Sequence, residues 1–139
     1  MASGIYNVFK ADLMEKQVSL VDAGDDIYVG LLSDGHTFTL TDTVWGSVSA
    51  NEIINQSGSG YTANGSLLDN KSVTTAAATK FDADNTAWSS STFTAYHAVL
   101  YDLSNTSSLI CSIDFGGAKT VSAGTFTIQW DVAGIITLT

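Results

Sequence analysis

Residues 109–138 read LICSIDFGGAKTVSAGTFTIQWDVAGIITL, and this stretch decides the fold that we expect. In Thr125–Val132 apolar and polar side chains alternate, which is typical of a strand with one buried and one exposed face. The same alternation in Leu109–Phe115 predicts a strand before it, and Ile135–Leu138 predicts a third strand. Because tight turns favour glycine, we expect the chain to turn at the glycines between these segments.

The rest of the chain offers one helix, several strands and one long connection. Apolar residues recur at helical spacing in 4–18, whereas Ile27–Leu32 and Phe93–Tyr101 are compact β-forming runs. Residues 67–78 contain one modest strand, and Asp42–Ser66 has no regular pattern. We therefore expect one domain over residues 1–139 that is all-β. The predicted architecture is an antiparallel β-sandwich with jelly-roll or Greek-key-like wiring and one N-terminal helix.

The charge balance is strongly acidic. Fourteen acidic residues face five lysines and no arginine, which gives a net charge of −9. Such a chain repels phosphate, so nucleic acid and anionic membrane surfaces are not expected partners. No apolar run reaches the roughly 20 residues that span a bilayer. The N-terminus has no basic start followed by an apolar segment, so we expect synthesis in the cytoplasm without a signal peptide.

Two acidic segments invite a calcium interpretation. Asp22, Asp25 and Asp26 lie within five residues, but a solvated acidic turn is the favoured interpretation. The segment starting at Asp82 resembles the first half of an EF-hand loop. Its sixth position is Ala87 instead of glycine, and its twelfth is Phe93 instead of glutamate. We therefore expect no metal and no cofactor.

Catalytic motifs are absent from the sequence as well. The two histidines are 61 positions apart, and His97 sits in a run of hydrophobic residues, where a structural role is favoured. Cys111 alternates with apolar residues and is expected to behave as a small core side chain. A pair of carboxylates for glycoside hydrolysis stays open, although no spacing singles one out. We expect a protein that is not an enzyme.

The three tryptophans divide into two groups. Trp130 belongs to the apolar face of a predicted strand and is expected in the core. Trp45 and Trp88 fall in predicted loops, where an exposed indole would indicate contact with a partner or a sugar.

Six segments spread over the chain have a characteristic order and spacing. They are GIYNVFKADLM from Gly4, ANEI from Ala50 with GYTANGSLL from Gly60, ATKFDADNTAW from Ala78, FTAYHAVLYD from Phe93 and SLICSIDFGGAKTVSAGTFTIQWDVAGIITL from Ser108. Through these segments the whole chain resembles a family of small virion structural proteins of tailed bacteriophages. The resemblance implies a non-enzymatic protein present in many copies, most simply a decoration or cement protein on the outer surface of the head. A tail or fibre component is the alternative.

This resemblance also implies a location and partners. The protein is expected in the virion, bound to the major capsid protein and to copies of itself as a homo-oligomer, most simply a trimer. The N-terminal helix and the Asp42–Ser66 connection are the expected contact regions. In the tail alternative, host glycans would bind at Trp45 or Trp88. The candidate contact residues are Tyr6, Phe9, Trp45, Tyr61 and Trp88.

Overall fold

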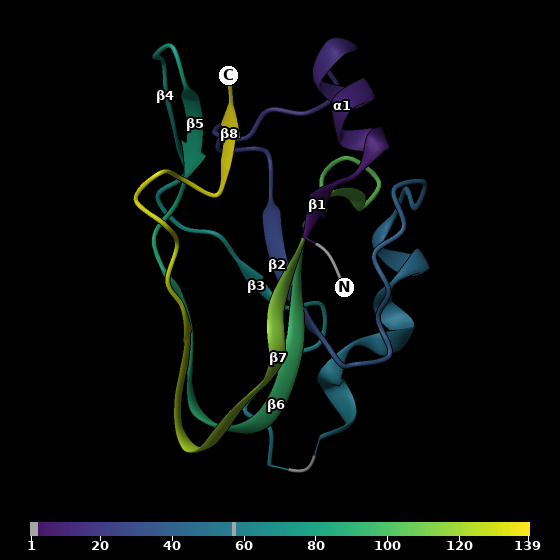
Figure 1. Ribbon diagram of the computed structural model, residues 1–139, viewed down its shortest axis with the longest axis vertical. Coiled ribbons are helices and arrows are strands. Elements are labelled where there is room, and N and C mark those ends of the chain that lie inside the picture. The colour runs from purple at the N-terminus through teal and green to yellow at the C-terminus, as the bar shows by residue number, and fades with distance from the viewer. Residues whose placement is uncertain (1–2, 57) are drawn as a thin grey trace.

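The computed structural model describes residues 3–56 and 58–139, which form two antiparallel sheets and one α-helix (Figure 1). The larger sheet has the strand order β1-β7-β6-β2-β3, and the smaller has the order β4-β5-β8. The predicted all-β sandwich with one N-terminal helix is confirmed. The elements are β1 (Gly4–Ile5), α1 (Asn7–Met14), β2 (Ile27–Leu32), β3 (Ser66–Leu67), β4 (Ser72–Thr74), β5 (Thr79–Asp82), β6 (Thr86–Asp102), β7 (Ser108–Ile128) and β8 (Ile136–Leu138), with 3-10 turns η1 (Trp45–Ser47), η2 (Ser49–Asn51) and η3 (Ile53–Asn55).

The stretch that decides the fold contains one long strand where we expected two. β7 runs without interruption for 21 residues and pairs with the 17-residue β6, so the predicted turn at Gly116–Gly117 is wrong. These glycines have φ of 74° and 138° and lie in a bulge of β7, where four residues oppose Tyr96 alone. Because β6 is continuous opposite the bulge, the segments of β7 on both sides of it pair with the same strand. The two glycines adopt the positive φ angles that the extra residues of the bulge require.

A second irregularity lies near the far end of the same hairpin. Ser91 pairs with Gly124 and Phe93 with Val121, so two residues of β7 oppose Thr92 alone. The positive φ falls on Ala123, at 47°, and not on Gly124. Bulges increase bending and twist, and the two long strands curve together through the lower end of the molecule before rising toward the small sheet (Figure 1).

The end of the chain belongs to the other sheet. β7 ends at Ile128, and β8 pairs with β5 instead of with the preceding strand, which corrects the predicted arrangement of three successive neighbours. Val132, predicted to share a buried face with Ile128, is 91% exposed in the turn between the strands.

Helix α1 is shorter than the predicted 4–18. Gly4 and Ile5 pair with β7 as a strand, so the helix begins only at Asn7. It ends at Met14, and Lys16 has a positive φ of 60°, which no helix continues. The sequence pattern shows an apolar stripe, but it does not show that a neighbouring strand takes the first residues.

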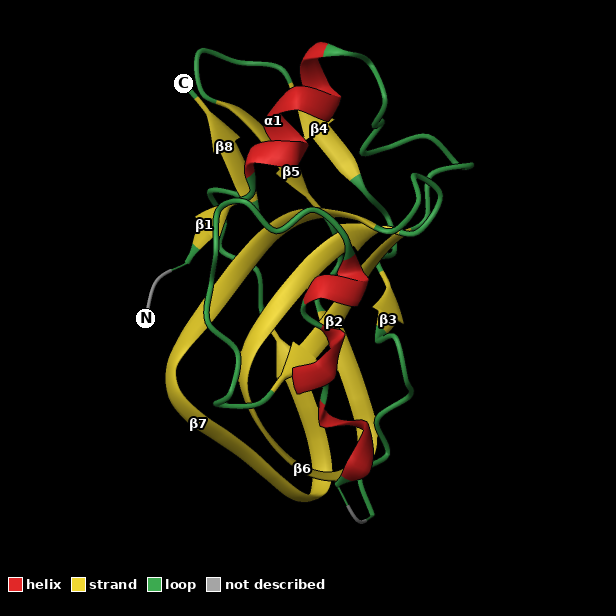
Figure 2. Ribbon diagram, turned by 90° about the vertical axis from the view of Figure 1, so that its right-hand side faces the viewer, coloured by secondary structure: helices red, strands yellow, loops and turns green. Residues whose placement is uncertain are grey.

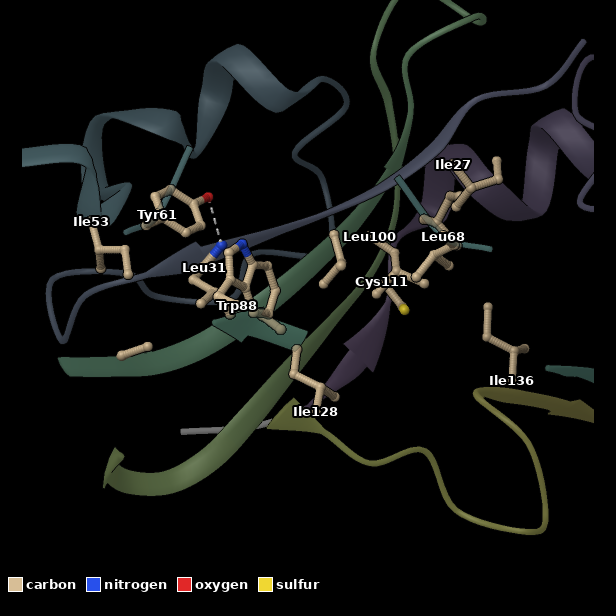
Figure 3. Packing of buried hydrophobic residues seen from close by; sticks show 14 of the residues in the cluster. Ile27, Leu31, Ile53, Tyr61, Leu68, Trp88, Leu100, Cys111, Ile128 and Ile136 are labelled. Carbon is tan, nitrogen blue, oxygen red and sulfur yellow. Dashed lines mark hydrogen bonds between the residues drawn. The ribbon is translucent and has the colours of Figure 1, made fainter. Parts of the chain in front are cut away.

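Both faces of the large sheet are covered over β2 and the adjoining part of β6. Ile27, Val29 and Leu31 belong to the larger core cluster, in which Figure 3 labels Ile27 and Leu31. Leu32 belongs to a second cluster on the opposite face. This double coverage explains why IYVGLL is almost continuously apolar, as strands buried on both faces are. The second cluster consists of Tyr6, Leu32, Trp45, Val48, Val99, Tyr101 and Leu109.

The irregular Asp42–Ser66 connection covers the second cluster. Its three 3-10 turns lie over the large sheet near β2 (Figure 2). β3 pairs with only the first part of β2, at Tyr28 and Val29, and the Tyr61 hydroxyl accepts a hydrogen bond of 3.1 Å from the Leu31 backbone N–H (Figure 3). The connection therefore acts as a cover for an otherwise unpaired strand edge.

Candidate functional site

The five candidate contact residues all lie inside the protein. None of their side chains is more than 8% exposed, so they are core residues of the single chain and do not form a contact surface. Burying a large aromatic side chain removes much apolar area from water, which explains why the fold uses all five internally. The exposed fractions are 0% for Tyr6, 2% for Phe9, 6% for Trp45, 8% for Tyr61 and 6% for Trp88.

Two of these residues hold parts of the irregular connection together, and Trp45 also packs the connection on the sheet. The Tyr61 hydroxyl donates to Glu52 Oε1 at 2.7 Å, and Trp45 Nε1 donates to Asn64 Oδ1 at 3.3 Å. The Trp45 ring stacks on Tyr101 with centroids 4.6 Å apart and planes at 13°. The sequence pattern placed Trp45 and Trp88 in loops. Trp45 does lie in the irregular connection, where it is buried because the connection packs on the sheet, but the prediction for Trp88 is wrong, since Trp88 lies within strand β6.

The acidic segments do not gather into a metal site. In the described parts of the chain, no group of three or more His, Cys, Asp or Glu side chains is arranged to hold a metal ion. Asp82 instead forms an ion pair with Lys80 at 3.6 Å, and Asp84 accepts a hydrogen bond from Asn70 at 2.6 Å.

The two histidines meet, although they are 61 positions apart in the sequence. The rings of His36 and His97 are in edge contact, with centroids 5.0 Å apart. His36 Nε2 and the Ser112 hydroxyl share a hydrogen bond of 3.1 Å, and His97 Nδ1 lies 3.9 Å from Asp114 Oδ1. No spacing rule connects these residues, so sequence reasoning could not have found the cluster.

This polar cluster is closed to reactants. His36, His97 and Ser112 are 1%, 2% and 1% exposed. Burial, reinforced by the neighbouring His97, lowers the pKa of His36 to about 4. Burial also lowers the pKa of His97, and the nearby Asp114 carboxylate opposes this shift. Both histidines are therefore neutral at pH 7, and the cluster is a structural element of the core.

A pH dependence of stability follows from the pKa of His36. The unfolded histidine takes up a proton below pH 6.5, while the folded one does so only near pH 4. The contribution of the neutral, buried His36 to the free energy of unfolding is therefore complete above pH 6.5. It is lost as the pH falls toward 4, by up to about 1.4 kcal/mol per pH unit. We expect urea unfolding between pH 7 and 4 to show a flatter profile for His36→Gln than for the natural protein.

The comparison of these two profiles isolates His36 from other buried groups. Burial raises the pKa of Glu52 and of Asp102, which contributes in the opposite direction as the pH falls. Both carboxyl groups are present in the two proteins and cancel in the difference. Parallel profiles would show that the His36 ring does not resist protonation in the folded state.

The clearest exposed apolar feature is a groove between α1 and the small sheet. It has a volume of about 330 Å³, and we call it the helix–sheet groove. Phe81 of β5 and Ile136 of β8 are buried residues of its lining, and the eight-residue helix contributes Phe9 and Leu13. The groove is lined mainly by Phe9, Leu13, Val21, Val73, Phe81 and Leu138.

The rim of the helix–sheet groove exposes large aliphatic side chains. Val21, Val73 and Leu138 are 43%, 45% and 52% exposed. Lys80 is the charged residue of the lining, and Asp82 is its ion-pair partner. Apolar rims around a hollow on a monomer mark surfaces that bind another protein. Candidate contacts therefore lie near the predicted N-terminal helix. Apart from the buried Phe9, they are different residues from those that the sequence indicated.

The fold and the groove together define an acidic β-sandwich with an exposed apolar groove between its helix and its small sheet. No model of a known protein family, no curated protein and no solved structure matches this chain. Within the described residues, no helix has the length and apolar character that crossing a membrane requires.

Proposed function

We propose that this chain is a non-enzymatic structural protein of a tailed-bacteriophage virion, bound as a decoration or cement protein to the outer surface of the head. The observation that carries the proposal is the helix–sheet groove, an apolar surface on a chain with a net charge of −9. The phage assignment comes from the resemblance of segments spread over the whole sequence. The partners would be the major capsid protein and further copies of the chain.

Two physical features support a role in assembly. The strong negative charge disfavours packaged nucleic acid as a partner and suits the outer face of a shell. The His36–His97–Ser112 cluster, which contains catalytic residue types, is too deeply buried to meet a substrate. A rigid sandwich with an exposed apolar groove fits a protein that contributes contacts and not chemistry.

We expect substitutions on the groove rim to weaken binding to capsids. Val73→Glu and Leu138→Glu place a charge on half-exposed positions, so the fold is retained while the apolar contact is lost. Binding of the purified variants to heads that lack the protein should fall at least about tenfold, which corresponds to 1.4 kcal/mol. Co-sedimentation with the heads measures this binding.

Val132→Glu is the matched control, because Val132 is 91% exposed and is not part of the groove. It should bind heads like the natural protein. Equal binding by all three variants would rule out the groove as the contact.

The copy number per purified particle, measured by quantitative mass spectrometry, tests the location. A number comparable to that of the major capsid protein supports the head. A few copies would favour the tail or fibre, and absence from the particle would contradict the virion assignment.

A further inference from the structure

A second hollow lies where the end of β7 meets the chain that leads to β8. Its volume is about 530 Å³, which is within the range of small-molecule sites, and we call it the Trp130 cleft. Its lining is more polar than that of the helix–sheet groove, because it combines aromatic rings with several polar side chains and two charged ones. Its chief lining residues are Phe115, Lys119, Phe126, Gln129, Trp130 and Asp131.

The indole of Trp130 is held in one orientation at the cleft. Its Nε1 donates to the Asp84 carbonyl at 3.0 Å, and its backbone N–H donates to Asn85 Oδ1 at 2.9 Å. Trp130 is half-buried, although its sequence pattern predicted a core residue. Because the ring N–H already has an acceptor, the indole offers the cleft an apolar carbon surface in a fixed position.

The other side chains complete a mixed apolar and polar surface. Phe115 and Phe126 are half-buried neighbours, with ring centroids 6.2 Å apart. Gln129, Asp131 and Lys119 are exposed at the cleft. The amide donates and accepts hydrogen bonds, the carboxylate accepts them, and the ammonium group donates them. Asp131 is held by a 2.8 Å hydrogen bond that its Oδ1 accepts from the Ala133 N–H.

These features match the chemistry of a sugar ring. A pyranose has a face of C–H groups that packs on an aromatic ring and a rim of hydroxyls that donate and accept hydrogen bonds. A purely apolar ligand would leave the polar side chains at the cleft without hydrogen-bond partners in the ligand, which costs free energy. An anionic ligand would meet one lysine, one aspartate and a chain of net charge −9. The lining therefore selects a neutral, hydroxyl-rich ligand.

We infer that the Trp130 cleft binds a neutral saccharide, with the Trp130 indole under the sugar ring and Gln129 and Asp131 on its hydroxyls. This site does not depend on the virion role proposed above. It also moves the sugar platform from Trp45 and Trp88, which are each 6% exposed, to Trp130, which lines this cleft.

The indole N–H signals of the three tryptophans provide the test by two-dimensional NMR. The full chain is titrated with the methyl glycosides of glucose, galactose, mannose and N-acetylglucosamine. We expect at least one of these sugars to shift the Trp130 signal along a saturable curve, while the buried Trp45 and Trp88 signals stay in place. Signals are assigned with single Trp→Phe variants.

Gln129→Ala is the decisive variant, because Gln129 is exposed and its loss should leave the fold intact. We expect its affinity for the responding glycoside to fall about tenfold, the effect of losing hydrogen bonds to one side chain. Thr125→Ala is the control, four residues earlier in the chain near the end of β7. Thr125 is exposed and does not line the cleft, so this variant should bind like the natural protein. Either of two results would overturn the inference: no Trp130 shift with any of the four glycosides, or equal binding by Gln129→Ala and the natural protein.

Discussion

Replacing Gly65 by alanine is expected to lower the free energy of unfolding by about 3 to 5 kcal/mol. Gly65 has φ of 84°, a conformation that side chains rarely adopt. An added Cβ would lie 2.7 Å from the carbonyl carbon of Val29 and 2.8 Å from Gly30 Cα. Both are main-chain atoms of β2, so no side-chain rotation can relieve the contact.

The Asn64–Gly65 turn also cannot move away from the sheet. The Asn64 N–H donates to Glu52 Oε1 at 2.6 Å, and the Asn64 carbonyl accepts a 2.6 Å hydrogen bond from the Tyr101 hydroxyl. The Gly65 N–H itself donates to the Thr62 carbonyl at 3.0 Å. A shift that makes room for Cβ would break several of these hydrogen bonds, which is why the predicted effect exceeds that of backbone strain alone.

Gly116→Ala is the matched control, because Gly116 has a similar φ of 74° but no atom within 4 Å of the added Cβ. It should lose only about 1 kcal/mol, the cost of the backbone conformation. Urea unfolding at neutral pH measures both variants. Equal losses of unfolding free energy in the two variants would mean that the close approach of Gly65 to β2 adds nothing to the cost of the substitution.

Replacing Gly30 by alanine is the second substitution with a large expected effect. Gly30 lies in the middle of β2, where its added Cβ would come within 2.9 Å of two carbons of the Trp45 ring. The indole is confined by its stack on Tyr101 and by its hydrogen bond to Asn64. We expect a loss of about 2 to 4 kcal/mol, toward the upper end for overpacking a core.

A double-mutant cycle separates this contact from the general effect of alanine in a strand. Gly30→Ala should cost much less in a Trp45→Leu background, because the shorter side chain leaves room for the methyl group. Gly46→Ala, where no atom lies within 4 Å of the added Cβ, should leave stability nearly unchanged. Strict additivity of the two substitutions would show that the Trp45 ring is not what excludes a side chain at position 30.

Both predictions concern the same feature, the close packing of the irregular Asp42–Ser66 connection on the large sheet. Sequence reasoning assigned the contact surface to this connection because long loops are often functional. Its aromatic residues instead fill the space above Gly30 and along the edge of β2. The exposed aliphatic residues Val21, Val73 and Leu138, which surround the helix–sheet groove, lie outside this connection.

Neither the helix–sheet groove nor the Trp130 cleft could be predicted from the sequence, because both depend on how distant segments pack. Val73 and Leu138 come from opposite edge strands of the small sheet, and each taken alone is an ordinary exposed hydrophobic residue. Their position around one groove exists only after β4, β5 and β8 have paired. Trp130 has the correct alternation for a core strand, but β7 ends at Ile128, and the indole lies beyond the ladder.

The sequence by itself determined the class of fold, because alternation of side chains and helical spacing are local properties that residues a few positions apart display. It also determined the acidic character that disfavours nucleic acid, since charge is a sum over the chain. Only the tertiary structure decided that Gly116–Gly117 form a bulge, that His36 meets His97 and that Trp45 is buried. These outcomes depend on which distant segments become neighbours, and that choice is made by the packing of the whole chain.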